Sequence, residues 1–83
     1  MDKVLVTVRI SAIEKMYDIW VPLEGTIGEV KILIGVAVER LSNDRYCADS
    51  RAVLCSMETG MYYREEQTVK QSGIINGAAL MLI

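Results

Sequence analysis

Two alternating runs near the start of the sequence constrain the fold more than any other feature. In residues 3–10 every second residue is Val or Ile, and residues 16–22 alternate in the same way around Ile19 and Val21. A period of two with β-branched side chains predicts strands with one buried face. Because only residues 11–15 separate the runs, we expect an antiparallel hairpin. Its second strand ends at Pro22, which cannot donate a ladder hydrogen bond.

After the hairpin, residues 27–41 have the pattern of an amphipathic helix. Thr26 is a suitable N-cap, and Glu29 three residues later can complete a capping box. At about 100° per residue, one apolar stripe faces the hairpin. Its members are Ile27, Val30, Ile34, Ala37, Val38 and Leu41. Ile32 and Val36 lie on the opposite side, so this helix also points an apolar pair away from the core.

The second half of the chain predicts three further strands. Residues 51–57 and 61–64 flank a turn at 58–60, and residues 78–83 form a last apolar strand after the Asn76-Gly77 turn. Residues 42–50, rich in polar residues, are expected to form a loop. The predicted order is ββαβββ, which is an α+β fold. The expected core contains Val4, Val6, Val8, Ile19, Val21, Val30, Ile34, Leu80 and Leu82.

Composition limits the size of the fold and the classes of partner. With 83 residues, 52% of them apolar, and one proline, we expect a single domain over residues 1–83. The net charge of −2 comes from scattered charges without a basic patch, so we expect no nucleic-acid partner. No apolar stretch approaches the roughly 20 residues of a membrane-spanning helix, and the N-terminus does not resemble a signal peptide. These features predict a cytoplasmic protein without direct membrane insertion.

The side chains that enzymes use for chemistry are scarce. Histidine is absent, which removes imidazole bases and histidine metal ligands. Cys47 and Cys55 are too few for a disulfide framework or a four-ligand zinc site. The adjacent Glu65 and Glu66 have no nucleophile nearby in the sequence and are expected to be solvated charges. We therefore expect no catalytic residue, no metal, no cofactor and no enzyme activity.

Several short motifs resemble those of a known superfamily. Residues 26–31, Thr-Ile-Gly-Glu-Val-Lys, resemble the helix start of ubiquitin-like proteins, and residues 72–77, Ser-Gly-Ile-Ile-Asn-Gly, resemble their approach to the last strand. The resemblance implies a ubiquitin-like β-grasp: a mixed sheet with one helix packed on one face and the first and last strands parallel and central. Residues 17–22, Tyr-Asp-Ile-Trp-Val-Pro, together with residues 73–77, are most similar to the YukD/EsaB family, which is associated with bacterial type VII (WXG100) secretion systems.

This resemblance implies a non-catalytic protein-interaction module, specifically a cytosolic accessory protein of a type VII-like secretion system. Conjugated ubiquitin-like proteins and sulfur carriers extend a flexible tail that ends in Gly-Gly, whereas residues 78–83 are predicted to form a strand. We therefore expect a protein that is not conjugated. Two alternatives stay open: a modifier or sulfur carrier activated at a C-terminal Gly-Gly that is missing from this chain, and a small accessory subunit of a multicomponent enzyme.

A surplus of apolar residues predicts surfaces for protein partners. A small domain buries only about 60 to 65% of the surface of its unfolded chain, while the mean hydropathy here is +0.27. Trp20 should point outward beside Leu5, where it either binds a partner or packs on Lys3 and Pro22. Ile32 and Val36 either contact a partner or lie under a loop. The predicted partner-binding residues are Leu5, Trp20, Met81 and Ile83 on the outer sheet face, and Ile32 and Val36 on the outer helix face. Two such surfaces could hold two partners, or one partner and a second copy of the chain.

Overall fold

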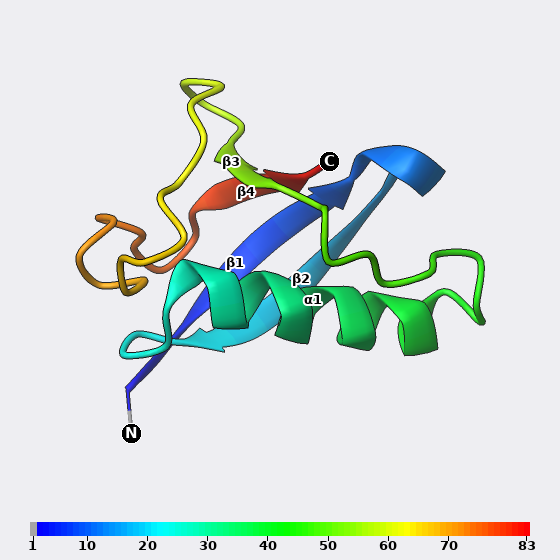
Figure 1. Cartoon of the computed structure of the whole chain (residues 1–83), viewed down its shortest axis with the longest axis horizontal. Helices are drawn as coiled ribbons and strands as arrows, with labels where there is room; N and C mark the ends of the chain where they lie inside the picture. Colours follow the sequence, from blue (N-terminus) through cyan, green and yellow to red (C-terminus); the bar gives the residue numbers. More distant parts are fainter. Residues whose placement is uncertain (1) are drawn as a thin grey trace.

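A single mixed sheet crossed by one helix organises the chain (Figure 1). The computed structural model describes residues 2–83. The sheet has the order β2-β1-β4-β3. β1 pairs antiparallel with β2 and parallel with β4, and β3 pairs antiparallel with β4. The elements are β1 (Lys3–Ile10), the 3-10 helix η1 (Ser11–Ile13), β2 (Lys15–Pro22), α1 (Ile27–Leu41), β3 (Leu54–Ser56) and β4 (Ala79–Leu82). The mixed sheet, its central parallel pair and the single covering helix agree with the prediction.

The N-terminal hairpin forms as the alternation predicts. Val6 of β1 pairs with Ile19 of β2, and both side chains are buried under α1. All nine residues of the predicted core are buried. The inward face of the sheet and one stripe of α1 therefore share one apolar core, and the alternate residues of β1 and β2 form the opposite, outer face.

The helix has the bounds that the sequence predicts, Ile27–Leu41, because its start is encoded locally. The Glu29 N–H donates to Thr26 Oγ1 at 3.2 Å, and the Thr26 N–H donates to Glu29 Oε1 at 3.0 Å, which completes the capping box. One member of the predicted inward stripe is wrong: Leu41 is exposed. It lies beside Ile13 and Tyr17, where the β1–β2 hairpin ends and gives it little to pack on.

The strands of the second half differ from the prediction. The predicted strand over residues 51–57 is shortened to β3, Leu54–Ser56, and the last strand covers Ala79–Leu82 rather than 78–83. The predicted strand at 61–64 is wrong, since only an isolated bridge joins Tyr62 to Cys55. The reason lies in the path of the chain beyond that bridge. It turns to the start of α1, where the Gly28 N–H donates to the Glu65 carbonyl and the Ile27 N–H donates to the Gln67 carbonyl. Within residues 2–83 the strand and helix order is therefore ββαββ rather than ββαβββ.

Candidate interaction surfaces

The outer face of the sheet carries an exposed tryptophan. Trp20 of β2 lies directly opposite Leu5 of β1 and is 57% exposed, on the face turned away from α1. Side chains directly opposite each other in an antiparallel pair have Cβ atoms about 5 Å apart, so Trp20 and Leu5 form one apolar patch. We call these two residues the Trp20 patch.

The backbone beneath the Trp20 patch is fixed by the segment that precedes β4. The Leu5 N–H donates to Asn76 Oδ1 at 2.7 Å, and the Gly77 N–H donates to the Leu5 carbonyl at 2.7 Å. Gly77 has a φ of +88°, a conformation that favours glycine. The Asn76-Gly77 pair therefore turns the chain and also satisfies both backbone groups of Leu5 in the central strand β1.

Met81 and Ile83 do not join the Trp20 patch, although they were predicted on the same face. Met81 pairs with Arg9 and Cys55, and Arg9 is four residues along β1 from Leu5, which pairs with Trp20. The row between them is polar, because Thr7 Oγ1 donates to Asp18 Oδ1 at 2.8 Å. Ile83 lies beyond β4, where it lines a hollow with Ile13 and Tyr46. The alternation gave the face of Met81 correctly and its distance from the Trp20 patch incorrectly.

The outer face of α1 is apolar over a larger area than the sequence indicated. Ile32 and Val36 are about half exposed, and Leu33 beside them is exposed to a similar degree. In the part of the chain that the structure describes, no loop covers the pair. Leu33 was not predicted because it does not share the one-turn spacing of Ile32 and Val36, although its position on the helical wheel indicates the same face.

Lys31 is a buried cation that sequence reasoning did not single out. It is only 9% exposed. Its Nζ donates to the Ser50 carbonyl at 3.1 Å, to the Ala52 carbonyl at 2.8 Å and to the Glu65 carboxylate. These partners lie far away along the chain, so no local motif signals them. They tie two irregular segments to α1, and the role of Lys31 is therefore structural.

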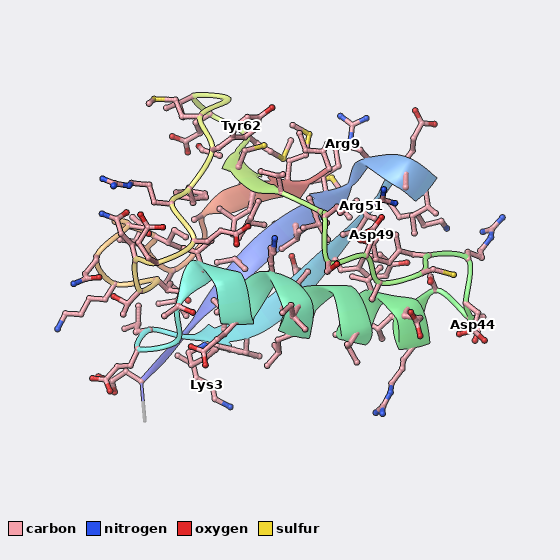
Figure 2. The ribbon with its side chains drawn as sticks, viewed as in Figure 1. Lys3, Arg9, Asp44, Asp49, Arg51 and Tyr62 are labelled. Atoms are coloured by element: carbon pink, nitrogen blue, oxygen red, sulfur yellow. The ribbon has the colours of Figure 1, made fainter. Side chains whose placement is uncertain are left out.

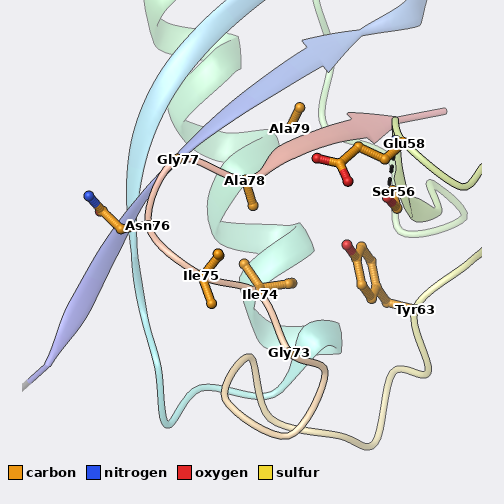
Figure 3. A pocket seen from close by; sticks show the side chains of 10 residues that line it. All are labelled: Ser56, Glu58, Tyr63, Gly73, Ile74, Ile75, Asn76, Gly77, Ala78 and Ala79. Atoms are coloured by element: carbon orange, nitrogen blue, oxygen red, sulfur yellow. Dashed lines mark hydrogen bonds between the residues drawn. The ribbon is translucent and has the colours of Figure 1, made fainter.

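Hollows elsewhere on the molecule have little reactive chemistry. Figure 3 shows a pocket of about 310 Å³ between the segment before β4 and the end of β3. Its polar side chains are Ser56, Glu58, Tyr63 and Asn76.

Figure 2 shows Asp49 and Arg51 together on the loop between α1 and β3, where they form an ion pair at 3.3 Å. The hydrogen bonds that the Arg51 backbone and side chain donate hold the pKa of the Asp49 carboxyl below its ordinary value.

The reactive residue types are dispersed. Among residues 2–83, no cluster of three or more His, Cys, Asp or Glu could hold a metal ion. Burial raises the pKa of the Cys55 thiol, which keeps it protonated and a poor nucleophile. Cys47 is exposed on the loop after α1. Over the same residues, no helix has the length and the apolar character needed to cross a membrane.

Comparison with known proteins identifies the fold. No protein-family model matches the sequence, and no characterised protein matches it by sequence. Solved structures do match. The ubiquitin-like domain of the Mycobacterium tuberculosis type VII secretion system protein ECCD1 is 14% identical with a TM-score of 0.76, and the match covers 100% of this chain and 99% of that one.

Two further structures have the same fold. A chain of the MycP5-free ESX-5 inner membrane complex is 15% identical with a TM-score of 0.78, covering 98% of this chain and 20% of that one. A chain of the toluene 4-monooxygenase HD complex is 12% identical with a TM-score of 0.75, covering 98% of this chain and 96% of that one. The protein therefore has a ubiquitin-like β-grasp fold, and its structural neighbours include ubiquitin-like domains of type VII secretion components.

Proposed function

We propose that this chain is a non-catalytic ubiquitin-like module that binds a protein partner through the Trp20 patch. The observation that carries the proposal is the 57% exposure of Trp20 beside Leu5, on a sheet face that the fold does not need for its core. Tryptophan is the residue type most enriched at binding hot spots, and an aromatic side chain buries about 150 to 250 Å² when a partner covers it.

The backbone supports this use of the patch. A binding residue contributes most when it is ordered before the partner arrives, because less freedom is then lost on association. Leu5 lies opposite Trp20 in the central strand β1, and its N–H and carbonyl are both bonded on the other side, to Asn76 and Gly77. The Trp20 patch is thus presented by regular sheet rather than by a loop.

For the biological setting, we propose a cytoplasmic accessory protein of a type VII-like secretion system, of the YukD/EsaB kind. Support comes from residues 17–22 and 73–77, which resemble that family, and from the similarity to the ECCD1 domain over nearly its whole length. The partner is then a component of the secretion apparatus. Genes for WXG100 proteins and an FtsK-like ATPase next to the gene for this chain are the expected observation.

A second candidate function is a small accessory subunit of a multicomponent enzyme. The similarity to a chain of the toluene 4-monooxygenase complex favours it, because the match covers almost all of both chains. Oxygenase genes beside the gene for this chain would select this function instead. In either setting the chain itself binds a protein and performs no chemistry.

The binding test uses the full chain and the purified secretion components encoded beside its gene. Trp20→Ala should weaken binding by about 2 kcal/mol or more, which is about thirtyfold in Kd, as measured by isothermal titration calorimetry. Thermal unfolding should change little, because the side chain is mainly exposed.

Met16→Ala is the matched control. Met16 lies on the same strand and the same face as Trp20 and is 56% exposed, but it pairs with Arg9, away from the Trp20 patch. Its replacement should leave the affinity within about threefold of the wild type. Equal effects of the two substitutions, or no binding to any secretion component, would contradict the proposal.

A further inference from the structure

The outer face of α1 has an ordered charge pattern around its apolar residues. Glu29, Leu33, Val36 and Arg40 follow one another at intervals of four, three and four residues, and Ile32 lies beside them. These intervals place the side chains along one stripe of a helix. We call the five residues the α1 seam. It has an acid at the N-terminal end, three apolar residues in the middle and a base at the C-terminal end.

The two charged ends of the α1 seam differ in how they are held. Glu29 Oε1 accepts hydrogen bonds from the Thr26 N–H and hydroxyl, which fixes the carboxylate and lowers its pKa. Arg40 is exposed, and within residues 2–83 it makes no ion pair. The neighbouring Glu39 is turned toward the loop, where its carboxylate accepts the Ala48 N–H at 2.8 Å. The seam therefore has a fixed negative end and a free positive end.

We propose that a second copy of this chain packs on the α1 seam, with the two α1 helices antiparallel about a twofold axis. Glu29 and Arg40 lie equally far from the middle of the seam, and so do Leu33 and Val36. One antiparallel alignment therefore places Glu29 of each copy against Arg40 of the other, and Leu33 of each copy against Val36 of the other. This is the self-complementary pattern that an isologous dimer requires.

The charges select both the occupant and its direction. A parallel pair would oppose like charges at both ends, Glu29 to Glu29 and Arg40 to Arg40, and like-charge contacts disfavour binding. The antiparallel pair satisfies both ends and covers the half-exposed Ile32, Leu33 and Val36 of both copies. The order of charges therefore favours a second copy in the antiparallel direction, independently of what binds the Trp20 patch.

The size of the α1 seam sets the strength of the dimer. From Glu29 to Arg40 the helix rises about 16 Å, and three side chains supply the apolar contact. The area that this seam can bury is smaller than the roughly 800 Å² per partner of a standard stable interface. We therefore expect a weak, concentration-dependent dimer that high salt weakens further, because its ion pairs lie at the rim.

Sedimentation equilibrium of the full chain tests the proposal, from roughly 1 µM to roughly 1 mM, a range that covers weak complexes. The wild type should shift from monomer to dimer as its concentration rises. Arg40→Glu opposes two acids at both ends of the seam, and Glu29→Lys opposes two bases. Each variant alone should dimerise about tenfold more weakly or worse. Lys70→Glu, which makes the same charge change at an exposed position outside the α1 seam, should dimerise like the wild type.

The decisive measurement is the equimolar mixture of Arg40→Glu and Glu29→Lys. Only in the mixed pair does each end again join an acid to a base, so the mixture should dimerise more strongly than either variant alone. A monomer at all concentrations, or a mixture no stronger than its components, would overturn the proposal.

Because Glu29→Lys removes half of the capping box, a second variant retains it. Glu29→Gln retains the acceptor for Thr26 and removes the charge. It should weaken the dimer less than Arg40→Glu while its thermal unfolding stays close to that of the wild type. A dimer unaffected by both Glu29→Gln and Arg40→Glu would also overturn the proposal.

Discussion

At the scale of single residues, Lys31 has a structural role that no local sequence motif indicates. An ammonium group is costly to bury unless it is hydrogen-bonded and paired. Here Nζ uses its three donors on the Ser50 and Ala52 carbonyls and on Glu65, and the stem packs along α1. One side chain thus holds the loop between α1 and β3 and the segment after β3 against the same helix.

Lys31→Met tests this role, because methionine has a similar length and no donor. The substitution leaves two carbonyls and a carboxylate without their partner, so the free energy of unfolding should fall by about 1 to 3 kcal/mol. Urea unfolding followed by circular dichroism measures the change. Lys70→Met, the same substitution at an exposed position, should stay within about 0.5 kcal/mol of the wild type. Equal stability of the two variants would show that Lys31 is not a structural anchor.

At the scale of elements, two reciprocal caps of the same form occur in different places. Thr26 and Glu29 form the capping box of α1. Thr68 and Gln71 repeat its geometry in the irregular segment before β4: the Gln71 N–H donates to Thr68 Oγ1 at 3.1 Å, and the Thr68 N–H donates to Gln71 Oε1 at 3.0 Å. The first cap ends in a titratable carboxyl and the second in a neutral amide, so only the first responds to pH.

The pH dependence of the α1 cap follows from the pKa of Glu29. Hydrogen bonds from the Thr26 backbone and hydroxyl lower that pKa from its ordinary value of 4.5 in the folded state. The stability that they contribute is therefore present above pH 4.5 and is lost as the pH falls through the lower folded value. Thr26→Ala removes the hydroxyl and keeps the backbone N–H that donates to Glu29. It should cost about 1 kcal/mol at pH 7, and only the part that comes from the bond between the hydroxyl and the carboxylate should be lost toward about pH 3.

Thr68→Ala is the control for that experiment. It removes the hydroxyl that accepts the Gln71 N–H and keeps the backbone N–H that donates to Gln71 Oε1. Its effect on the free energy of unfolding should not change with pH, because an amide does not titrate. Denaturant unfolding at several pH values compares the two variants. Parallel pH profiles for Thr26→Ala and the wild type would show that the bond from the Thr26 hydroxyl to the Glu29 carboxylate does not contribute.

The same elements show which parts of the fold local sequence determines. The bounds of α1 were predicted because its cap and its period lie within the helix, and the hairpin was predicted because its alternation is continuous. The path of residues 61–74 was not predicted. It depends on bonds such as those from the Val69 N–H to the Gly25 carbonyl and from the Lys70 N–H to the Leu23 carbonyl, between residues distant in the sequence. Val69 is thus fully buried inside a stretch that appears polar.

The candidate surfaces were predicted only in part, because alternation within one strand does not determine how that strand aligns with its neighbours. The two-residue alternation predicts which face of a sheet each residue occupies. It correctly placed Trp20 beside Leu5. The alternation does not give the register between two strands, so it does not determine the distance between residues of different strands on the same face. Met81 was therefore assigned to the right face, but the register of β1 with β4 separates it from Leu5. Lys31 was missed because its partners are 19 or more residues away.

At the scale of the whole molecule, the two proposed surfaces lie on opposite sides of a thin body. The extents are 31 × 27 × 22 Å. α1 covers one face of the sheet (Figure 1), and Trp20 and Leu5 are on the other. A dimer joined through the α1 seam would therefore present two Trp20 patches outward. Each patch can then bind one partner molecule, but the two patches face in opposite directions and cannot both reach one flat surface that carries the partner.

The two surfaces should therefore act independently, since substitutions far apart and without shared partners have additive effects. Trp20→Ala should leave the dimer constant within about twofold by sedimentation equilibrium. Arg40→Glu should leave the affinity for a partner free in solution unchanged by calorimetry. A loss of dimerisation in Trp20→Ala, or a loss of affinity for the partner in Arg40→Glu, would show that one face serves both roles.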